Sequence, residues 1–244
     1  VGCLNLEAHL AAKGAPIVRP QALAPGSRWH ATGLYDASLA LAIDTPVVGN
    51  DLDADGTDLV VVTGANRGGK TTFLRALGLS QLMMQAGMSV AATGLTAGCA
   101  IALATHFKRE EDAGMTSGKL DEETARMSAV VDDLRPGSLL LSNESFASTN
   151  EREGSEIFRQ ILGALTESGV RVVAVTHLYD LAEGLYDAGR GTTLFLRAER
   201  TEGGGRPFLL TPGEPLPTSF GPDVYRRIFG EHVGRSEHAE PAPA

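Results

Sequence analysis

Cysteine is scarce in this sequence, and long apolar runs are missing from it. The 244 residues include two cysteines, Cys3 and Cys99, which form no CxxC pair and have no histidine at ligand spacing. A disulfide framework or a Cys–His metal site is therefore not expected. We expect a reducing, cytoplasmic setting instead. No apolar run approaches the ~18 residues of a membrane-spanning helix, so we expect no membrane partner.

An excess of positive charge is also lacking. The chain carries 21 Lys and Arg residues against 30 Asp and Glu residues, for a net charge of −9. Proteins that hold nucleic acid by charge alone are usually basic. This chain is thus a poor candidate for a DNA-contacting surface. It starts at Val1 with no signal-peptide pattern behind it, and we interpret it as part of a longer polypeptide.

What the sequence has in quantity is glycine and short apolar runs. Hydrophobic residues make up 43% of the chain and there are 29 glycines, as is typical of an α/β protein. Runs typical of buried strands alternate with stretches in which apolar residues recur at helical spacing. Strands are expected at 58–64, 99–107, 138–142 and 171–177, and helices at 70–87, 120–134 and 151–168. This alternation predicts a mostly parallel central sheet flanked by helices.

The rest of the chain is less regular. Residues 1–35 mix Pro, Gly and Ala, and we interpret them as a connector from an upstream domain. Residues 36–234 form the predicted domain, and residues 235–244 read as a disordered tail. Within the domain, the stretch 38–43 alternates weakly and fits a strand.

Two further elements are expected near the end of that domain. Apolar runs on either side of Gly203, Gly204 and Gly205 predict a β-hairpin, which would add an antiparallel part to the sheet. A short helix fits 221–230, with Pro222 in its first turn.

The segment GANRGGKT, residues 64–71, matches the phosphate-loop pattern G-x-x-x-x-G-K-[ST] at every fixed position. A glycine-rich turn with a chance lysine is the alternative, but a predicted strand precedes the segment and a predicted helix follows it. Inward-facing N–H groups and the helix N-terminus favour phosphate. Lys70 is expected at the β- and γ-phosphates, and the Thr71 hydroxyl at Mg²⁺. The residues expected to bind nucleotide here are Gly64, Ala65, Asn66, Arg67, Gly68, Gly69, Lys70, Thr71 and Thr72.

The run LLLSNE, ending at Glu144, resembles a Walker B strand. Glu144 is placed to polarise an attacking water, as the second acidic residue of that motif does. Asn143 stands where a carboxylate is usual in the Mg²⁺ shell. Its side-chain oxygen can accept a hydrogen bond from a metal-bound water, but without charge it should hold the ion less well. A buried strand that exits into a polar loop is the alternative.

His177 ends the run VVAVTH, again at the end of a predicted strand. Ligands of open α/β sheets sit at the carboxyl ends of the strands, so this histidine is placed to sense a γ-phosphate or to orient water. A lone histidine is more often an ordinary surface or core residue. The two neighbouring motifs make a functional role the favoured interpretation here. His106 keeps the ordinary interpretation of a structural histidine.

Three segments in this order and spacing, TGANRGGKTTFLR, LLLSNESFASTNEREG and VVAVTHLYDL, resemble the ATPase domain of the MutS family of DNA mismatch-repair proteins, within the ABC-type ATPase superfamily. The resemblance covers most of residues 36–230. It implies a P-loop NTPase fold, ATP and Mg²⁺ as cofactors, and DNA contact through regions outside this chain. It further implies Val48, Gly49 and Asn50 beside the adenine.

The resemblance also implies a head-to-tail homodimer with ATP bound between two copies. Ser148 and Thr149, after the Walker B strand, would lie at the dimer contact. The stretch 117–127 would face the partner's γ-phosphate, with Ser117 or Gly118 in the place of the family's serine. That stretch has no aromatic residue, and Asn143 replaces Asp, so the chain looks like a divergent branch of the family.

Four functions remain open on these residues. The leading one is an ATP-hydrolysing dimerisation domain of a MutS-like DNA-binding protein, with Glu144 and His177 as catalytic groups. A second is an ATP-gated dimerisation switch with little hydrolysis, because of Asn143. An ABC transporter subunit is disfavoured because LSGGQ is absent, and a small-molecule kinase because Glu144 and His177 pair at strand ends.

Overall fold

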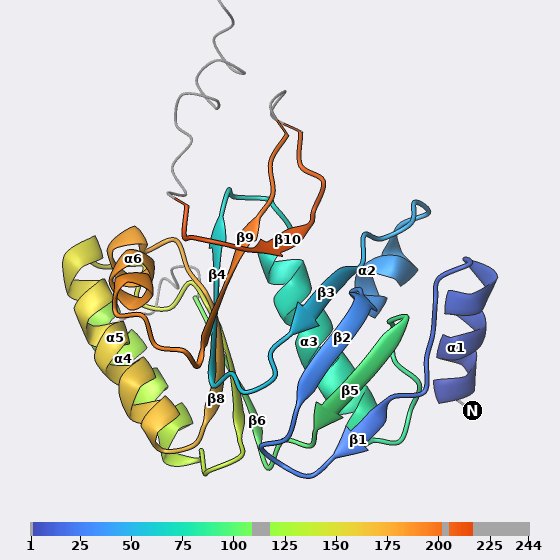
Figure 1. The fold of residues 1–244 in the computed structure, drawn as a ribbon, viewed down its shortest axis with the longest axis horizontal. Helices are drawn as coiled ribbons and strands as arrows, with labels where there is room; N and C mark the ends of the chain where they lie inside the picture. Colours follow the sequence, from blue (N-terminus) through green and yellow to red (C-terminus); the bar gives the residue numbers. More distant parts are fainter. Residues whose placement is uncertain (1, 109–117, 202–204, 217–244) are drawn as a thin grey trace, which may run out of the picture.

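The computed structural model describes residues 2–108, 118–201 and 205–216, which form an α/β arrangement with two sheets (Figure 1). The larger sheet is mostly parallel, since only its edge pair β10 and β9 runs antiparallel. Its strands, in spatial order, are β10 (Leu210–Pro212), β9 (Thr193–Ala198), β4 (Leu59–Gly64), β8 (Arg171–Val175), β7 (Leu139–Asn143) and β6 (Leu103–Phe107).

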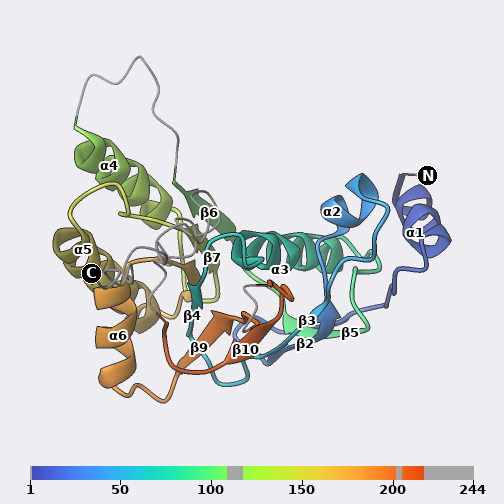
Figure 2. The same ribbon diagram turned by 90° about the horizontal axis from the view of Figure 1, so that it is seen from above.

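The central strands are buried on both faces because alternate side chains pack against different helices. Val60 and Val62 of β4 belong to the core that contains α3 (Lys70–Gln85), whereas Val61 packs with α5 (Glu151–Glu167). The helices α4 (Lys119–Asp132) and α6 (Tyr179–Asp187) cover the same face as α5 (Figure 2). The predicted mostly parallel sheet with helices on both faces is thereby confirmed, as is the antiparallel hairpin of β9 and β10.

The smaller sheet packs on the other side of α3. Its order is β1 (Gln21–Leu23), β5 (Gly94–Gly98), β2 (Trp29–Leu34) and β3 (Asn50–Asp53). Trp29 and Leu34 are buried in the same core as Val60. Residues 1–35, expected as a connector, therefore contain α1 (Gly2–Ala12), β1 and β2, and β2 shares the core of the following domain.

The stretch 38–43 was expected as a strand, and this was wrong. It lies almost wholly in α2 (Ala37–Ala42), because Asp36 caps a helix there. The Asp36 Oδ1 atom accepts from Ser38 N at 2.9 Å and from Leu39 N at 3.2 Å. A side-chain acceptor at this position satisfies amides that begin a helix, and it outweighs a short alternation of apolar residues. The helix expected at 221–230 and the tail expected at 235–244 lie outside the described residues.

Three strands set the place of the site. Because β4, β8 and β7 are consecutive and parallel, their carboxyl ends lie at one edge of the sheet, where the three polar motifs begin. None of the helices in the described part of the chain has the length and apolar character needed to cross a bilayer.

Candidate functional site

The three sequence motifs meet at the carboxyl edge of the large sheet. The loop 64–71 follows β4, Glu144 follows β7, and His177 lies two residues beyond β8. The Thr71 hydroxyl donates to Asn143 Oδ1 at 3.2 Å. Glu144 Oε1 lies 3.8 Å from His177 Nδ1. The structure therefore brings together the four side chains for which the sequence predicts metal-binding or catalytic roles.

The side chain of Lys70, the first residue of α3, reaches back into the glycine-rich loop that precedes the helix. Its side chain is buried, and Nζ donates to Gly64 O at 2.6 Å and to Ala65 O at 3.1 Å. Burial lowers the pKa of the Lys70 ammonium, and the carboxylate of Glu144 opposes that shift. An ammonium has three N–H donors, so one remains for an anion even while both carbonyls are bound.

The glycines of the loop serve two different purposes. Gly69 caps α3 with φ +92°, a left-handed conformation that favours glycine. Gly68 allows close packing, since a Cβ there would lie 2.7 Å from Ala198 Cβ and 2.9 Å from Ala65 O. The loop thus lies flat against β9 and then turns sharply into the helix, whose N-terminus attracts anions.

Glu144 sits in a strained turn with its backbone anchored. Its φ is +56°, and its N–H donates to Val175 O at 2.8 Å. The interaction with His177 is the largest influence lowering the pKa of the Glu144 carboxyl, against the opposing effect of burial, and the charges of Lys70 and Lys108 add to it. The group is therefore ionised near neutral pH and can accept hydrogen bonds from a water molecule.

A cavity of about 480 Å³ opens beside the loop. One side of it is polar and is formed by the backbone and side chains of 66–72 with Glu144. The other side is apolar and comes from the segment that joins β2 to β3. Its apolar lining includes Leu34, Tyr35, Leu39, Ile43, Val47 and Val48. A ligand with a charged end and a flat apolar end would match such a lining.

Asn50, expected beside an adenine, has its amide committed to the protein. It is 7% exposed, its Nδ2 donates to Phe208 O at 3.1 Å, and its Oδ1 accepts from Leu210 N at 2.7 Å. These bonds tie β3 to the chain entering β10. Gly49 also has a structural role, because a Cβ there would lie 2.7 Å from Gly33 O.

Sequence reasoning missed Phe208. Its side chain is 48% exposed, it lines the cavity, and its backbone has φ +59°. A Cβ on Gly69 would lie 3.5 Å from Phe208 Cβ, so the aromatic residue stands next to the start of α3. The signal available in the sequence was an aromatic residue two positions before a short edge strand, which is too common to single out.

The residues expected to contact a second subunit are placed as follows. Ser117 lies outside the described residues. Gly118 is the cap of α4, with φ −59° and ψ +148°. Ser148 and Thr149 precede α5, and Thr149 Oγ1 donates to Glu153 Oε2 at 2.9 Å.

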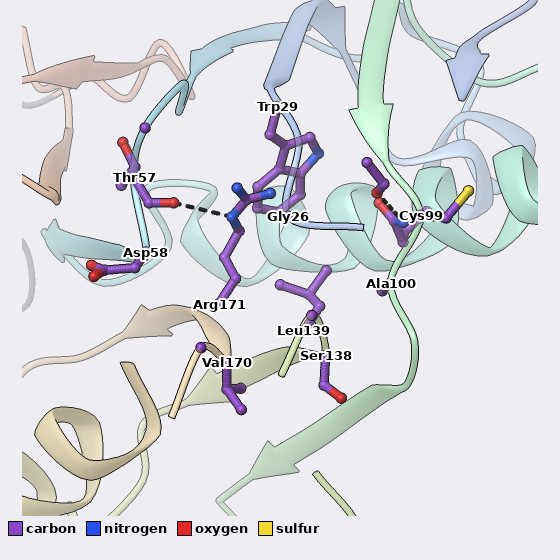
Figure 3. A pocket seen from close by; sticks show the side chains of 15 residues that line it. Gly26, Trp29, Thr57, Asp58, Cys99, Ala100, Ser138, Leu139, Val170 and Arg171 are labelled. Atoms are coloured by element: carbon purple, nitrogen blue, oxygen red, sulfur yellow. Dashed lines mark hydrogen bonds between the residues drawn. The ribbon is translucent and has the colours of Figure 1, made fainter. Parts of the chain in front are cut away.

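A second cavity, of about 260 Å³, lies at the amino ends of the same strands (Figure 3). Arg171, the first residue of β8, lies 5.6 Å from the centre of the Trp29 ring. Its Nε donates to Thr57 O, and one terminal nitrogen donates to Ser27 O, both at 3.1 Å. The charged group is thus used to join the two sheets, and this cavity is separate from the motif edge.

The residues that could hold a metal are few. Residues 2–108, 118–201 and 205–216 contain no group of three or more His, Cys, Asp or Glu side chains that could hold a metal ion. Thr71 and Asn143 offer two neutral oxygens that already face each other. Mg²⁺ keeps several of its waters in proteins and is usually held by one or two carboxylates and by phosphate oxygens, so this neutral pair would form only part of its shell.

Comparison with known proteins gives consistent similarities. Residues 60–203 match the family model described as MutS domain V. The chain is 40% identical over 134 residues to endonuclease MutS2 of Anaeromyxobacter sp. (strain Fw109-5), covering 53% of this chain and 16% of that protein. It is 28% identical over 144 residues to the DNA mismatch repair protein MutS of Chloroflexus aurantiacus, covering 57% and 15%. It is 29% identical over 167 residues to endonuclease MutS2 of Leuconostoc citreum, and this match covers 68% of this chain and 20% of that protein.

We predict that Asn50→Asp destabilises the chain although it is nearly isosteric. The new carboxylate would face Phe208 O without a donor, so about 2 kcal/mol of unfolding free energy should be lost. The matched control is Asn150→Asp, because Asn150 caps α5 through its side-chain oxygen and Asp serves equally well there. Urea unfolding of both variants checks this, and equal stability of the two would contradict the assigned role of Asn50.

Proposed function

The chain belongs to the MutS family, and we propose that it is an ATP-binding and ATP-hydrolysing dimerisation domain with a P-loop NTPase fold of the ABC-ATPase type. The family match spans more than half of its residues. The chain covers a fifth or less of the length of the relatives named above, whose names refer to endonuclease or DNA mismatch repair activity. We propose that it drives a MutS-like DNA-binding protein in the cytoplasm, with DNA bound by regions outside this chain.

One observation carries the proposal. The Thr71 hydroxyl of the phosphate loop reaches the end of β7 and bonds Asn143, next to the ionised Glu144. A phosphate loop alone is a local pattern, whereas a phosphate loop joined to a strand-end acceptor and a carboxylate is an arrangement for hydrolysis. Lys70 and the helix N-terminus would bind the phosphates, with Thr71 and Asn143 holding the Mg²⁺ shell.

The chemistry assigned to each group follows from its state. A bound Mg²⁺ would draw charge from the phosphate oxygens. Glu144, as a carboxylate, would orient the attacking water and accept its proton. His177 lies beside that carboxylate and lowers its pKa, and we expect it to meet the γ-phosphate as well. The oxygen of Asn143 accepts a hydrogen bond but lacks charge, which weakens its hold on a cation.

The apolar half of the cavity is assigned to the adenine ring. Phe208 and Val48 both line it, and Phe208 lies next to the loop that would bind the phosphates. Asn50 would act indirectly, by fixing the backbone on either side of Leu209. A flat base between apolar side chains and a triphosphate at the helix N-terminus suits the two-sided lining.

A second copy of the chain would complete the site head to tail. In this arrangement Ser117 and Gly118 face the partner's γ-phosphate, and Ser148 and Thr149 lie at the contact between copies. Gly118 is the cap of α4, so this arrangement would bring the start of that helix to the partner's triphosphate.

Lys70→Ala is expected to weaken ATP binding at least tenfold and to abolish hydrolysis, because it removes the ammonium at the phosphate loop. Equilibrium titration with a fluorescent ATP analogue measures the first effect, and phosphate release measures the second. Arg135→Ala, an exposed cation near the amino end of β7, is the matched control and should bind as the parent does. Full activity in Lys70→Ala would exclude the assigned site.

An ATP-gated switch that barely hydrolyses is the second candidate, favoured by the neutral Asn143 in contact with Thr71. Asn143→Asp distinguishes the two. The added carboxylate should lower the Mg²⁺ concentration needed for half-maximal activity about tenfold and raise turnover. The measurement is hydrolysis against Mg²⁺ concentration for both chains. Superimposable titrations would place Asn143 outside the metal shell.

A further inference from the structure

The turn that carries Glu144 is held in an unfavourable backbone conformation. Glu144 has φ +56° and Phe146 has φ +60°, and neither is glycine. Left-handed conformations cost free energy for residues with a Cβ, so the surroundings must hold the turn in place. The groups that hold it therefore also set where the Glu144 carboxylate lies.

The strand side of the turn is tied by buried hydroxyl groups. Ser145 Oγ lies 2.6 Å from His106 Nδ1 on β6 and 2.6 Å from Ser142 Oγ on β7. All three side chains are fully buried. His106, expected from the sequence to be a structural histidine, thus anchors the residue next to Glu144.

The far side of the turn is packed tightly around Phe146. Its ring is fully buried, with ring centres 6.1 Å from His106 and 5.6 Å from Phe158. A Cβ on Gly154 of α5 would lie only 2.3 Å from Phe146 O, so the helix presses directly on this backbone. Phe146 therefore has little room to move away from α5.

A carboxylate from α4 completes the hold on Phe146. Glu123 is 5% exposed, and its Oε1 accepts from Phe146 N at 2.7 Å. Burying a carboxylate costs free energy unless the group is hydrogen-bonded or paired with a charge. A charge-assisted bond to a backbone N–H is among the stronger hydrogen bonds. Glu123 lies within the first two turns of α4, shortly after the cap at Gly118.

We propose that Glu123 is a positioning residue that couples the Gly118 end of α4 to the Glu144 carboxylate through the backbone of Phe146. A triphosphate bound by a second copy of this chain would engage the start of α4. The Glu123 bond would carry that contact to the catalytic turn, so that hydrolysis depends on the partner. This inference rests on the proposed function.

Two conservative substitutions separate geometry from charge. Glu123→Gln keeps a side-chain oxygen at the same reach, and its turnover should stay within about threefold of the parent. Glu123→Asp keeps the charge but withdraws the oxygen from Phe146 N, and its turnover should fall about ten- to a hundredfold. The Michaelis constant for ATP should change less than threefold, because the phosphate loop is untouched.

Asp132→Asn is the matched control, since it removes an exposed carboxylate from the end of the same helix and should leave turnover unchanged. Thermal melting is recorded for every variant. Glu123→Asp with parental turnover would overturn the proposal. So would a loss of turnover matched by an equal loss of ATP affinity, since that pattern indicates general damage to the fold.

Hydrogen–deuterium exchange of residues 144–150 provides a readout that does not need hydrolysis. ATP should slow exchange there in the parent and in Glu123→Gln but not in Glu123→Asp. Equal slowing in all three chains overturns the coupling and leaves the proposed function standing. A parent chain that binds no ATP overturns the proposed function itself, and this inference with it.

Discussion

The site depends on the hydrogen bond from Thr71 to Asn143. The strands that precede these residues, β4 and β7, are not neighbours, because β8 lies between them. The loop after β4 must therefore reach across the end of β8 to meet β7, and the bond at 3.2 Å shows that it does. The left-handed turn at Gly69 makes this possible by starting α3 over the sheet edge. Without that reach, the loop and the end of β7 would remain two separate features.

Charge at this edge is balanced between groups that are largely withdrawn from water. The interaction with His177 lowers the pKa of the Glu144 carboxyl most, and Lys70 and Glu144 also shift each other's pKa, in each case toward the charged form. Asn143, which accepts from the Thr71 hydroxyl at the same end of the sheet, adds no charge. A bound phosphate would take the third N–H of the Lys70 ammonium, so the bonds to Gly64 O and Ala65 O can stay in place and the loop need not open.

Features encoded by short, local patterns were predictable from the sequence. The strands buried on both faces, such as β4 and β8, can be recognised from a few residues each, and so can the glycine-rich turn that follows β4. The smaller sheet was not predictable in this way, because its strands are half exposed and pair with residues far away in the sequence, as Trp29 does with Ala97. The helix α2 depended on the cap at Asp36, and six weakly alternating residues cannot reveal that.

The residues of the candidate site also fall into those that the sequence could predict and those that it could not. Lys70 and Glu144 stand in short motifs, so the sequence alone is enough to propose roles for them, and in the structure their charges interact. Phe208 was missed because it reaches the cavity only after Asn50 ties its backbone to β3. Glu123 was missed because a glutamate in an amphipathic helix is normally exposed, and only the strained turn at Phe146 gives this one a buried partner.

We propose that this chain hydrolyses ATP at a site completed by a second copy. Steady-state hydrolysis measured against protein concentration, for the parent and for Glu144→Gln, tests it most directly. We expect a rate that rises faster than linearly with protein concentration and is lost in Glu144→Gln. A rate strictly proportional to concentration, or one that survives in Glu144→Gln, would contradict it.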